Sequence, residues 1–204
     1  MRISVMAWVI VTGFLIGSSA GCVRTQPTHY YILSSIDSEG RSSMPSIDGP
    51  DVRIGLGPLT LPSYLDRAGI VTRITPNTLN IADFDNWAEP LHQNVMSVVS
   101  ENLSWLLGTD NIVTYPWKRS HTVDYQLVLD VIEFDVNSAG NALLFARWSV
   151  VGDDGETVIA TNKGRYVRTP AGKDYHHLVQ ALSETLEDMS REIADRMTAL
   201  LTHE

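Results

Sequence analysis

The sequence predicts an α+β fold, in which a mostly antiparallel sheet has two long helices packed on one face. Apolar residues recur at helical spacing near residues 86–107 and 174–201, and the segments before and between these alternate as strands do. Because the order is strands, helix, strands, helix, both helices can cover one face of a sheet built from neighbouring strands. Turn sequences at 137–141 and 152–155 indicate antiparallel pairing in its last part.

The first half of the chain begins with strands. Residues 29–33 are aromatic and branched, which is typical of a strand, and residues 36–51 are rich in Ser, Gly, Pro and Asp, as in a loop. Further strands are expected at 52–56, with a break or bulge at Gly57-Pro58, and at 70–74 and 79–81 around the turn 75–77.

The two helices have recognisable ends and faces. We expect the first to start near Asp85 or Asn86, with Pro90 tolerated in its first turn and Gly108 as its C-terminal cap. Its face carries Leu91, Val95, Val98, Asn102 and Leu106, flanked by Val99 and Leu103. The last helix is expected over 174–201, with Asp174 as its N-terminal cap. Its stripe is Leu178, Leu182, Leu186, Met189, Ile193, Met197 and Leu200, and the strands between the helices are expected at 112–115, 125–136, 142–151 and 157–167.

The chain begins with a secretion signal that ends at its single cysteine, Cys22. Arg2 precedes an apolar run over 3–16, which at about 14 residues suits a signal-peptide core and is shorter than the ~20 needed to span a bilayer. We predict a cleaved signal peptide over 1–21 and a bacterial lipoprotein lipidated at Cys22. The alternative is an ordinary secretory signal with an incidental cysteine. Val23 stands where Asp would favour inner-membrane retention, so we expect the outer membrane, on its periplasmic face.

Composition limits the function classes. After a lipidated tether over 22–28, residues 29–204 suffice for a single domain with a full hydrophobic core. The formal net charge of −9 disfavours nucleic-acid binding and electrostatic adhesion to anionic lipid. Once Cys22 is lipidated, no thiol remains for a disulfide, a cysteine-ligated zinc ion or thiol catalysis.

The sequence contains no arrangement typical of catalysis, cofactor binding or metal binding, so we predict a protein that is not an enzyme. His176 and His177 are adjacent on a helix, where side chains diverge by about 100° and cannot ligate one metal together. Asp83 and Asp85 are interpreted as caps of the first helix rather than as an acid–base pair, and Asp130, Glu133 and Asp135 as carboxylates on a solvated strand face. Trp105, Tyr115, Trp117 and Trp148 are interpreted as core, with an apolar partner or lipid groove as the alternative.

Two motifs resemble those of a known family. Residues 61–73 read Leu-Pro-Ser-Tyr-Leu-Asp-Arg-Ala-Gly-Ile-Val-Thr-Arg, and residues 82–91 read Ala-Asp-Phe-Asp-Asn-Trp-Ala-Glu-Pro-Leu. Together with Tyr-Pro-Trp at 115–117 and the closing helix, they resemble the PqiC/YmbA family of auxiliary lipoproteins of ABC-type and MCE-type transport systems. Ala68 departs from the family, which often has Pro there, and Ser19 departs from its usual lipoprotein signal.

The resemblance implies a docking role without catalysis. Such proteins are outer-membrane lipoproteins that hold a periplasmic MCE-domain protein carrying lipids between the two membranes. The candidate partner-binding residues lie in one loop: Leu61, Pro62, Tyr64, Leu65, Asp66 and Arg67. The alternative for this loop is that Leu61 and Leu65 cover the open edge of the core. Asp66 is expected to pair with Arg67 and Arg73.

Three further expectations stay open. The protein could instead regulate an envelope enzyme, as peptidoglycan synthase activators do, although its short tether is unlike theirs. It could be a periplasmic lipid-binding carrier with its own cavity. A ring-shaped partner would also suit a homo-oligomeric ring.

Overall fold

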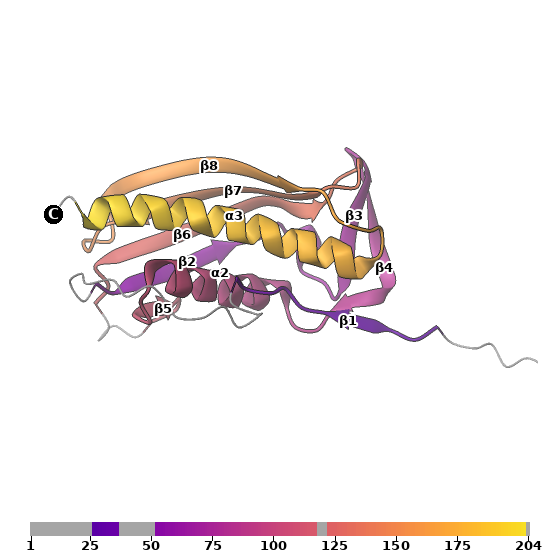
Figure 1. The fold of residues 1–204 in the computed structure, drawn as a ribbon, viewed down its shortest axis with the longest axis horizontal. Helices are drawn as coiled ribbons and strands as arrows, with labels where there is room; N and C mark the ends of the chain where they lie inside the picture. Colours follow the sequence, from indigo (N-terminus) through magenta and orange to yellow (C-terminus); the bar gives the residue numbers. More distant parts are fainter. Residues whose placement is uncertain (1–25, 37–51, 118–121, 203–204) are drawn as a thin grey trace, which may run out of the picture.

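The protein is an eight-stranded mixed sheet with two helices on one face, in the computed structural model that describes residues 26–36, 52–117 and 122–202 (Figure 1). The expected signal peptide, Cys22, most of the tether and the loop after Ile36 lie outside these residues. The α+β class is confirmed. In chain order the elements are β1 His29–Tyr31, β2 Ile54–Thr60, the 3-10 helix η2 Ser63–Leu65, β3 Gly69–Thr75, β4 Thr78–Trp87, α2 Leu91–Leu107, β5 Ile112–Thr114, β6 Tyr125–Val136, β7 Ala142–Val151, β8 Val158–Arg168 and α3 Tyr175–Leu201.

The sheet divides along β6. On one side β6 pairs antiparallel with β7 over its whole length, and β7 pairs antiparallel with β8. On the other side the first half of β6 pairs parallel with β2, which also pairs with β5. The end of β6 meets β3, which forms a hairpin with β4, and β4 pairs parallel with β1. The longest ladders are antiparallel, as predicted, while β1, β2 and β5 add parallel pairs.

Local patterns predicted the second half of the chain well. Strands β6 and β7 begin and end at the predicted residues, and β5 and β8 do so within one residue. Gly108 ends α2 in a left-handed conformation with φ 63°, as expected for a C-terminal cap. The Asp174 side chain accepts a hydrogen bond from the His177 amide and caps α3.

The predicted start of the first helix is wrong. Strand β4 continues to Trp87, and α2 begins at Leu91 with Pro90 at its N-cap. Asp83 and Asp85 therefore lie on a strand and cap nothing. The segment is extended because β4 has partners on both sides. On one side the Trp87 amide donates to Ala68 O at 2.8 Å, and on the other side β1 pairs with the end of β4.

The core lies between the sheet and the helices. Both helices cover the same face of the sheet, and they contact each other (Figure 1). The α3 stripe is buried from Leu182 to Met197, while Leu178 and Leu200 at its ends are partly buried. Trp148 is core as predicted, but Tyr115 is not, because it is 53% exposed and packs edge-on against Trp117.

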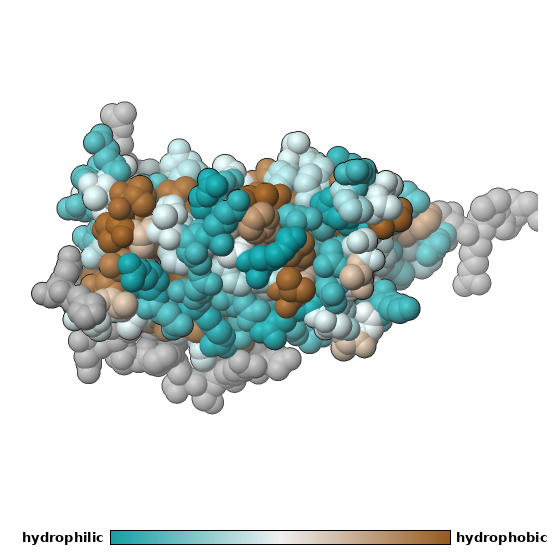
Figure 2. All heavy atoms as spheres, turned by 90° about the horizontal axis from the view of Figure 1, so that it is seen from above, coloured by the Kyte–Doolittle hydropathy of each residue, from teal (hydrophilic) through white to brown (hydrophobic). Residues whose placement is uncertain are grey.

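Seen from the side along which β8 runs, the surface is mostly hydrophilic, with apolar residues in separate patches (Figure 2). Among the described helices, none is long and apolar enough to cross a membrane.

Candidate functional site

The segment after β1 lies between the two helices and is held there by their side chains. The Leu33 amide donates to Asn94 Oδ1 (2.8 Å) and the Ile36 amide donates to Asn102 Oδ1 (2.8 Å), both on α2. From the other side, Ser183 Oγ of α3 accepts from the Ser34 amide at 3.1 Å. These polar side chains satisfy buried or partly buried backbone donors that have no strand beside them. The N-terminal segment is thereby fixed in the seam between α2 and α3.

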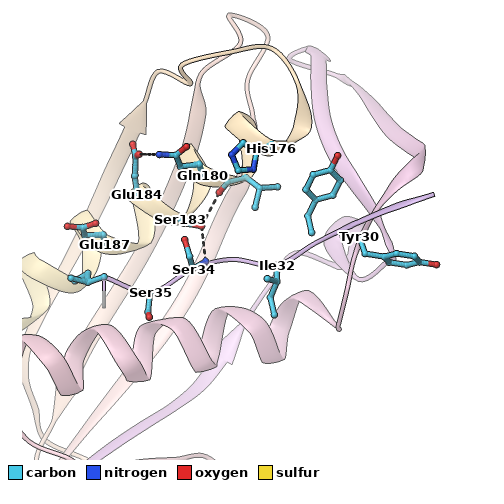
Figure 3. Close-up of a pocket in the computed structure, with 12 residues that line it drawn as sticks. Tyr30, Ile32, Ser34, Ser35, His176, Gln180, Ser183, Glu184 and Glu187 are labelled. Atoms are coloured by element: carbon cyan, nitrogen blue, oxygen red, sulfur yellow. Dashed lines mark hydrogen bonds between the residues drawn. The ribbon is translucent and has the colours of Figure 1, made fainter. Parts of the chain in front are cut away.

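A groove of about 520 Å³ opens beside this segment (Figure 3). Tyr30 and Ile32 contribute exposed apolar surface, at 67% and 57% exposure. The residues lining the α3 side include His176, Gln180, Glu184 and Glu187. The groove therefore combines exposed apolar side chains of the N-terminal segment with polar and acidic side chains of α3.

Strand β1 is tied to the sheet next to this groove. The Tyr31 hydroxyl donates to Asp85 Oδ1 at 2.9 Å, and His29 Nδ1 lies 3.4 Å from the same oxygen. Desolvation and then the neighbouring Asp85 carboxylate raise the pKa of Tyr31 to about 12. Tyr31 therefore stays protonated and keeps its donor role at neutral pH.

The predicted partner-binding loop spans η2 and splits into buried and exposed residues. Leu65 is buried, and Leu61 and Tyr64 are partly buried against the core. Asp66 and Arg67 are exposed. The apolar members therefore cover the core, as the alternative interpretation expects, while the charged pair remains open to solvent.

A partly buried ion pair holds this loop to the sheet. The Tyr64 hydroxyl donates to Asp135 Oδ2 at 3.1 Å, and Arg73 Nη2 lies 2.7 Å from the same oxygen. Arg73 Nε lies 3.1 Å from Glu133 Oε1. Arg73 thus pairs with these two carboxylates and not, as expected, with Asp66. Burial and then the Asp135 charge raise the pKa of Tyr64, and the hydrogen bond to Asp135 raises the pKa of Arg73.

Sequence reasoning missed the role of Asp135. The sequence predicts a solvated face for this carboxylate, whereas its exposure is 0%. The only signal was the position of Glu133 and Asp135 two residues apart near the end of an apolar strand, which puts both on one face. That face is buried locally because Tyr64 and Arg73 fold over it, and strand alternation does not reveal such a cover.

His92 and His177 make structural contacts. His92 Nε2 lies 3.0 Å from Leu59 O, and His177 Nδ1 lies 2.6 Å from Asp174 Oδ2 at the start of α3. Across 26–36, 52–117 and 122–202, no group of three or more His, Cys, Asp or Glu residues is placed to hold a metal ion.

Comparison with known families defines the class of this protein. Residues 31–194 match the model of the family described as the ABC-type transport auxiliary lipoprotein component. The chain belongs to this family, which groups auxiliary transport components and is not a family of enzymes. The predicted resemblance to PqiC/YmbA proteins is confirmed.

The first two of the following solved structures share the fold of this chain at low sequence identity, and the third is less similar. The crystal structure of an uncharacterized protein superposes with a TM-score of 0.67 at 20% identity, covering 84% of this chain and 99% of that one. Protein XCC0632 from Xanthomonas campestris, of family DUF330, gives 0.66 at 17% identity, covering 82% and 93%. A PelC dodecamer from Paraburkholderia phytofirmans reaches 0.44 at 13% identity, covering 74% and 92%. No curated protein matches the chain.

Proposed function

We propose that this protein is an outer-membrane lipoprotein that serves as a docking subunit of an MCE-type intermembrane lipid transport system, without catalysing a reaction. Membership of the auxiliary lipoprotein family supports the transport role. The observation that carries the docking role is the loop 61–67, whose exposed Asp66 and Arg67 stand on a base fixed by Tyr64 and Asp135.

A fixed loop suits recognition. Binding a partner costs side-chain and loop ordering, and this cost falls when the loop is already ordered. The Tyr64–Asp135 hydrogen bond and the burial of Leu65 provide that order before any partner arrives. Asp66 and Arg67 can then pair with charges on the MCE-domain partner, which sets specificity more than affinity.

The lipid anchor would hold the β1 end of the molecule close to the membrane. Seven residue steps separate Cys22 from His29, so this tether reaches at most about 25 Å. Because the segment after β1 is fixed between α2 and α3, force on the anchor is transmitted to the folded domain.

A first experiment tests the anchor and the partner together. The native protein is purified from the envelope, and we expect its intact mass to include the lipid and an MCE-domain protein to co-purify with it. The Cys22→Ser variant should leave the membrane fraction. An unmodified cysteine, or a Cys22→Ser variant that stays membrane-bound, would refute the anchor, and the lack of an MCE-domain partner would refute the docking role.

A second experiment tests the loop. Asp66→Arg reverses an exposed charge in the loop and should weaken capture of the partner about tenfold. Asp153→Arg is the control, because it makes the same charge change in the exposed turn after β7. Equal capture by both variants would remove the loop from the interface. The carrier alternative is decided by native mass spectrometry, since a carrier would retain bound phospholipid.

A further inference from the structure

Strand β8 is a long edge strand. Its eleven residues pair with β7 and with no other strand of the described chain. The outer edge of such a strand presents backbone N–H and C=O groups that can pair with an added strand. Figure 2 views the molecule from this side.

The two faces of β8 have different surroundings. On the inner face, Asn162 and Tyr166 donate hydrogen bonds to Glu192 of α3. Side chains alternate along a strand, so Lys163 and Arg165 point to the opposite, helix-free face of the sheet.

The helix-free face concentrates positive charge at β8. Lys163 stands directly opposite Arg147 of β7 in the register, an arrangement of like charges that destabilises a ladder. Lys163 Nζ lies 4.7 Å and Arg165 Cζ 5.2 Å from the centre of the Phe145 ring, which holds both cations over one aromatic side chain. In a chain of net charge −9, this cluster requires an explanation.

Two of the three cations of the cluster lie within ion-pair distance of a carboxylate. Arg147 Nη1 lies 3.7 Å from Asp130 Oδ2, and Arg165 Nη2 lies 3.4 Å from Glu133 Oε2, which also contacts Arg73 through its other oxygen. Exposed pairs of this length contribute little. Lys163 has no carboxylate within ion-pair distance among the described residues, so it is the cation of the cluster most available to an incoming anion.

The inner face carries an independent feature. A cavity of about 270 Å³ lies between β8 and α3, and its lining includes Trp148, Asn162 and Arg196. Trp148 is 3% exposed, and no acceptor among the described residues forms a hydrogen bond of normal geometry with its Nε1–H, although the Tyr166 hydroxyl lies nearby. A buried donor without an acceptor is unfavourable, so this cavity is suited to a side chain that brings a hydrogen-bond acceptor.

A second copy of this chain fits the edge poorly. Two β8 strands related by a two-fold axis would bring Lys163 and Arg165 of one copy against the same cations of the other. The other edge strands of the described chain, β1 and β5, have three residues each. Charge complementarity points instead to an acidic strand.

We propose that the free edge of β8 binds an extended acidic segment of a partner protein, which adds a strand to the sheet. Its alternate side chains are carboxylates over Lys163 and Arg165, and a side chain on its other face brings an acceptor to Trp148. The proposal does not depend on an MCE-domain partner, since it rests on the edge, the cations and the cavity alone.

The test uses the full mature chain and a short synthetic peptide in which Glu alternates with Thr. Nuclear magnetic resonance should show the peptide shifting the Trp148 indole N–H and slowing amide exchange along β8. The same peptide with N-methylated backbone amides, and a peptide with Lys in place of Glu, should not bind. Lys163→Glu should weaken binding about tenfold, whereas Lys173→Glu, an equal charge change at an exposed residue outside β8, should leave it unchanged.

Three results would overturn the proposal. The first is no binding of the Glu–Thr peptide. The second is equal binding of the N-methylated peptide, which would show charge attraction without strand addition. The third is a protein that ignores the peptide but binds phosphatidylglycerol vesicles through Lys163, which would make the cluster a membrane contact.

Discussion

Arg73 of β3 and Asp135 of β6 form a two-contact ion pair, with Nη2 2.7 Å from Oδ2 and Nε 3.5 Å from Oδ1. Their strands share a single register position, Thr72 opposite Val136, so backbone pairing alone joins them weakly. The ion pair strengthens this junction at the place where Tyr64 docks the loop 61–67. One buried carboxylate thus connects the hairpin β3–β4, strand β6 and the proposed partner-binding loop.

Replacing Asp135 by Asn should strongly destabilise the protein. The substitution leaves Arg73 with Glu133 and the Pro76 carbonyl and weakens the anchor of Tyr64, and the loss of hydrogen bonds to a charged group costs about 1.5–3 kcal/mol. Urea unfolding followed by circular dichroism measures the loss. Asp130→Asn is the control, because its pair with Arg147 is exposed and long, and it should cost less than about 1 kcal/mol. Similar losses for both variants would show that Asp135 has no special role.

Asn102→Leu should release the N-terminal segment from the seam between the helices. The substitution removes the acceptor of the buried Ile36 amide, which costs about 1–3 kcal/mol. Amide exchange at Ile36 should therefore accelerate more than exchange at the centre of β6. Gln93→Leu, on the exposed side of α2, provides the control and should change neither. Unchanged exchange at Ile36 in Asn102→Leu would contradict the proposed lock.

Elements that depend on local patterns could be predicted from the sequence. The ends of β6 and β7 follow from alternating apolar residues between clear turns, and the ends of the helices at Gly108 and Asp174 follow from cap chemistry. The stripe of α3 follows from its helical spacing. Each of these signals lies within a few residues of the structure that it specifies.

Elements that depend on partners distant in the sequence could not be predicted from it. The segment around Asp85 satisfies local rules for a helix start, but its pairing with β1, more than fifty residues earlier in the chain, makes it a strand. The local pattern predicts that Asp135 is a solvated carboxylate, but in the folded protein Tyr64 and Arg73 cover it. Asn102, which lies on the predicted apolar face, gains its role from the Ile36 amide. The candidate site is assembled from such long-range contacts.

Stability at alkaline pH should report on Tyr64. The pKa of this residue is raised above its ordinary value of 10 in the folded protein, so its stabilising effect is complete below pH 10. Above pH 10 the unfolded chain loses the proton first, and stability falls by up to about 1.4 kcal/mol per pH unit for this group. Tyr64→Phe lacks this dependence. At pH 7 the variant should be about 1 kcal/mol less stable because it loses the hydrogen bond to Asp135.

The measurement is urea unfolding of both proteins from pH 7 to 12. The two stability curves should converge above pH 10. An ultraviolet titration should show that Tyr64→Phe has lost one of the tyrosines that ionise last. Parallel stability curves over the whole range would contradict the assignment.

Gly57 should tolerate alanine much less well than Gly140 does. Both have positive φ, 117° and 83°, but a Cβ at Gly57 would lie 2.6 Å from the Tyr115 Cβ, whereas a Cβ at Gly140 has nothing within 4 Å. We expect Gly140→Ala to cost about 1 kcal/mol through its backbone alone, and Gly57→Ala to cost about 3 kcal/mol because it adds the clash. Thermal unfolding measures both. Since Gly57 lies at the irregularity of β2 that precedes the loop 61–67, Gly57→Ala should also weaken partner capture, whereas Gly140→Ala should not. Equal losses of stability would show that the space around Gly57 does not limit the substitution.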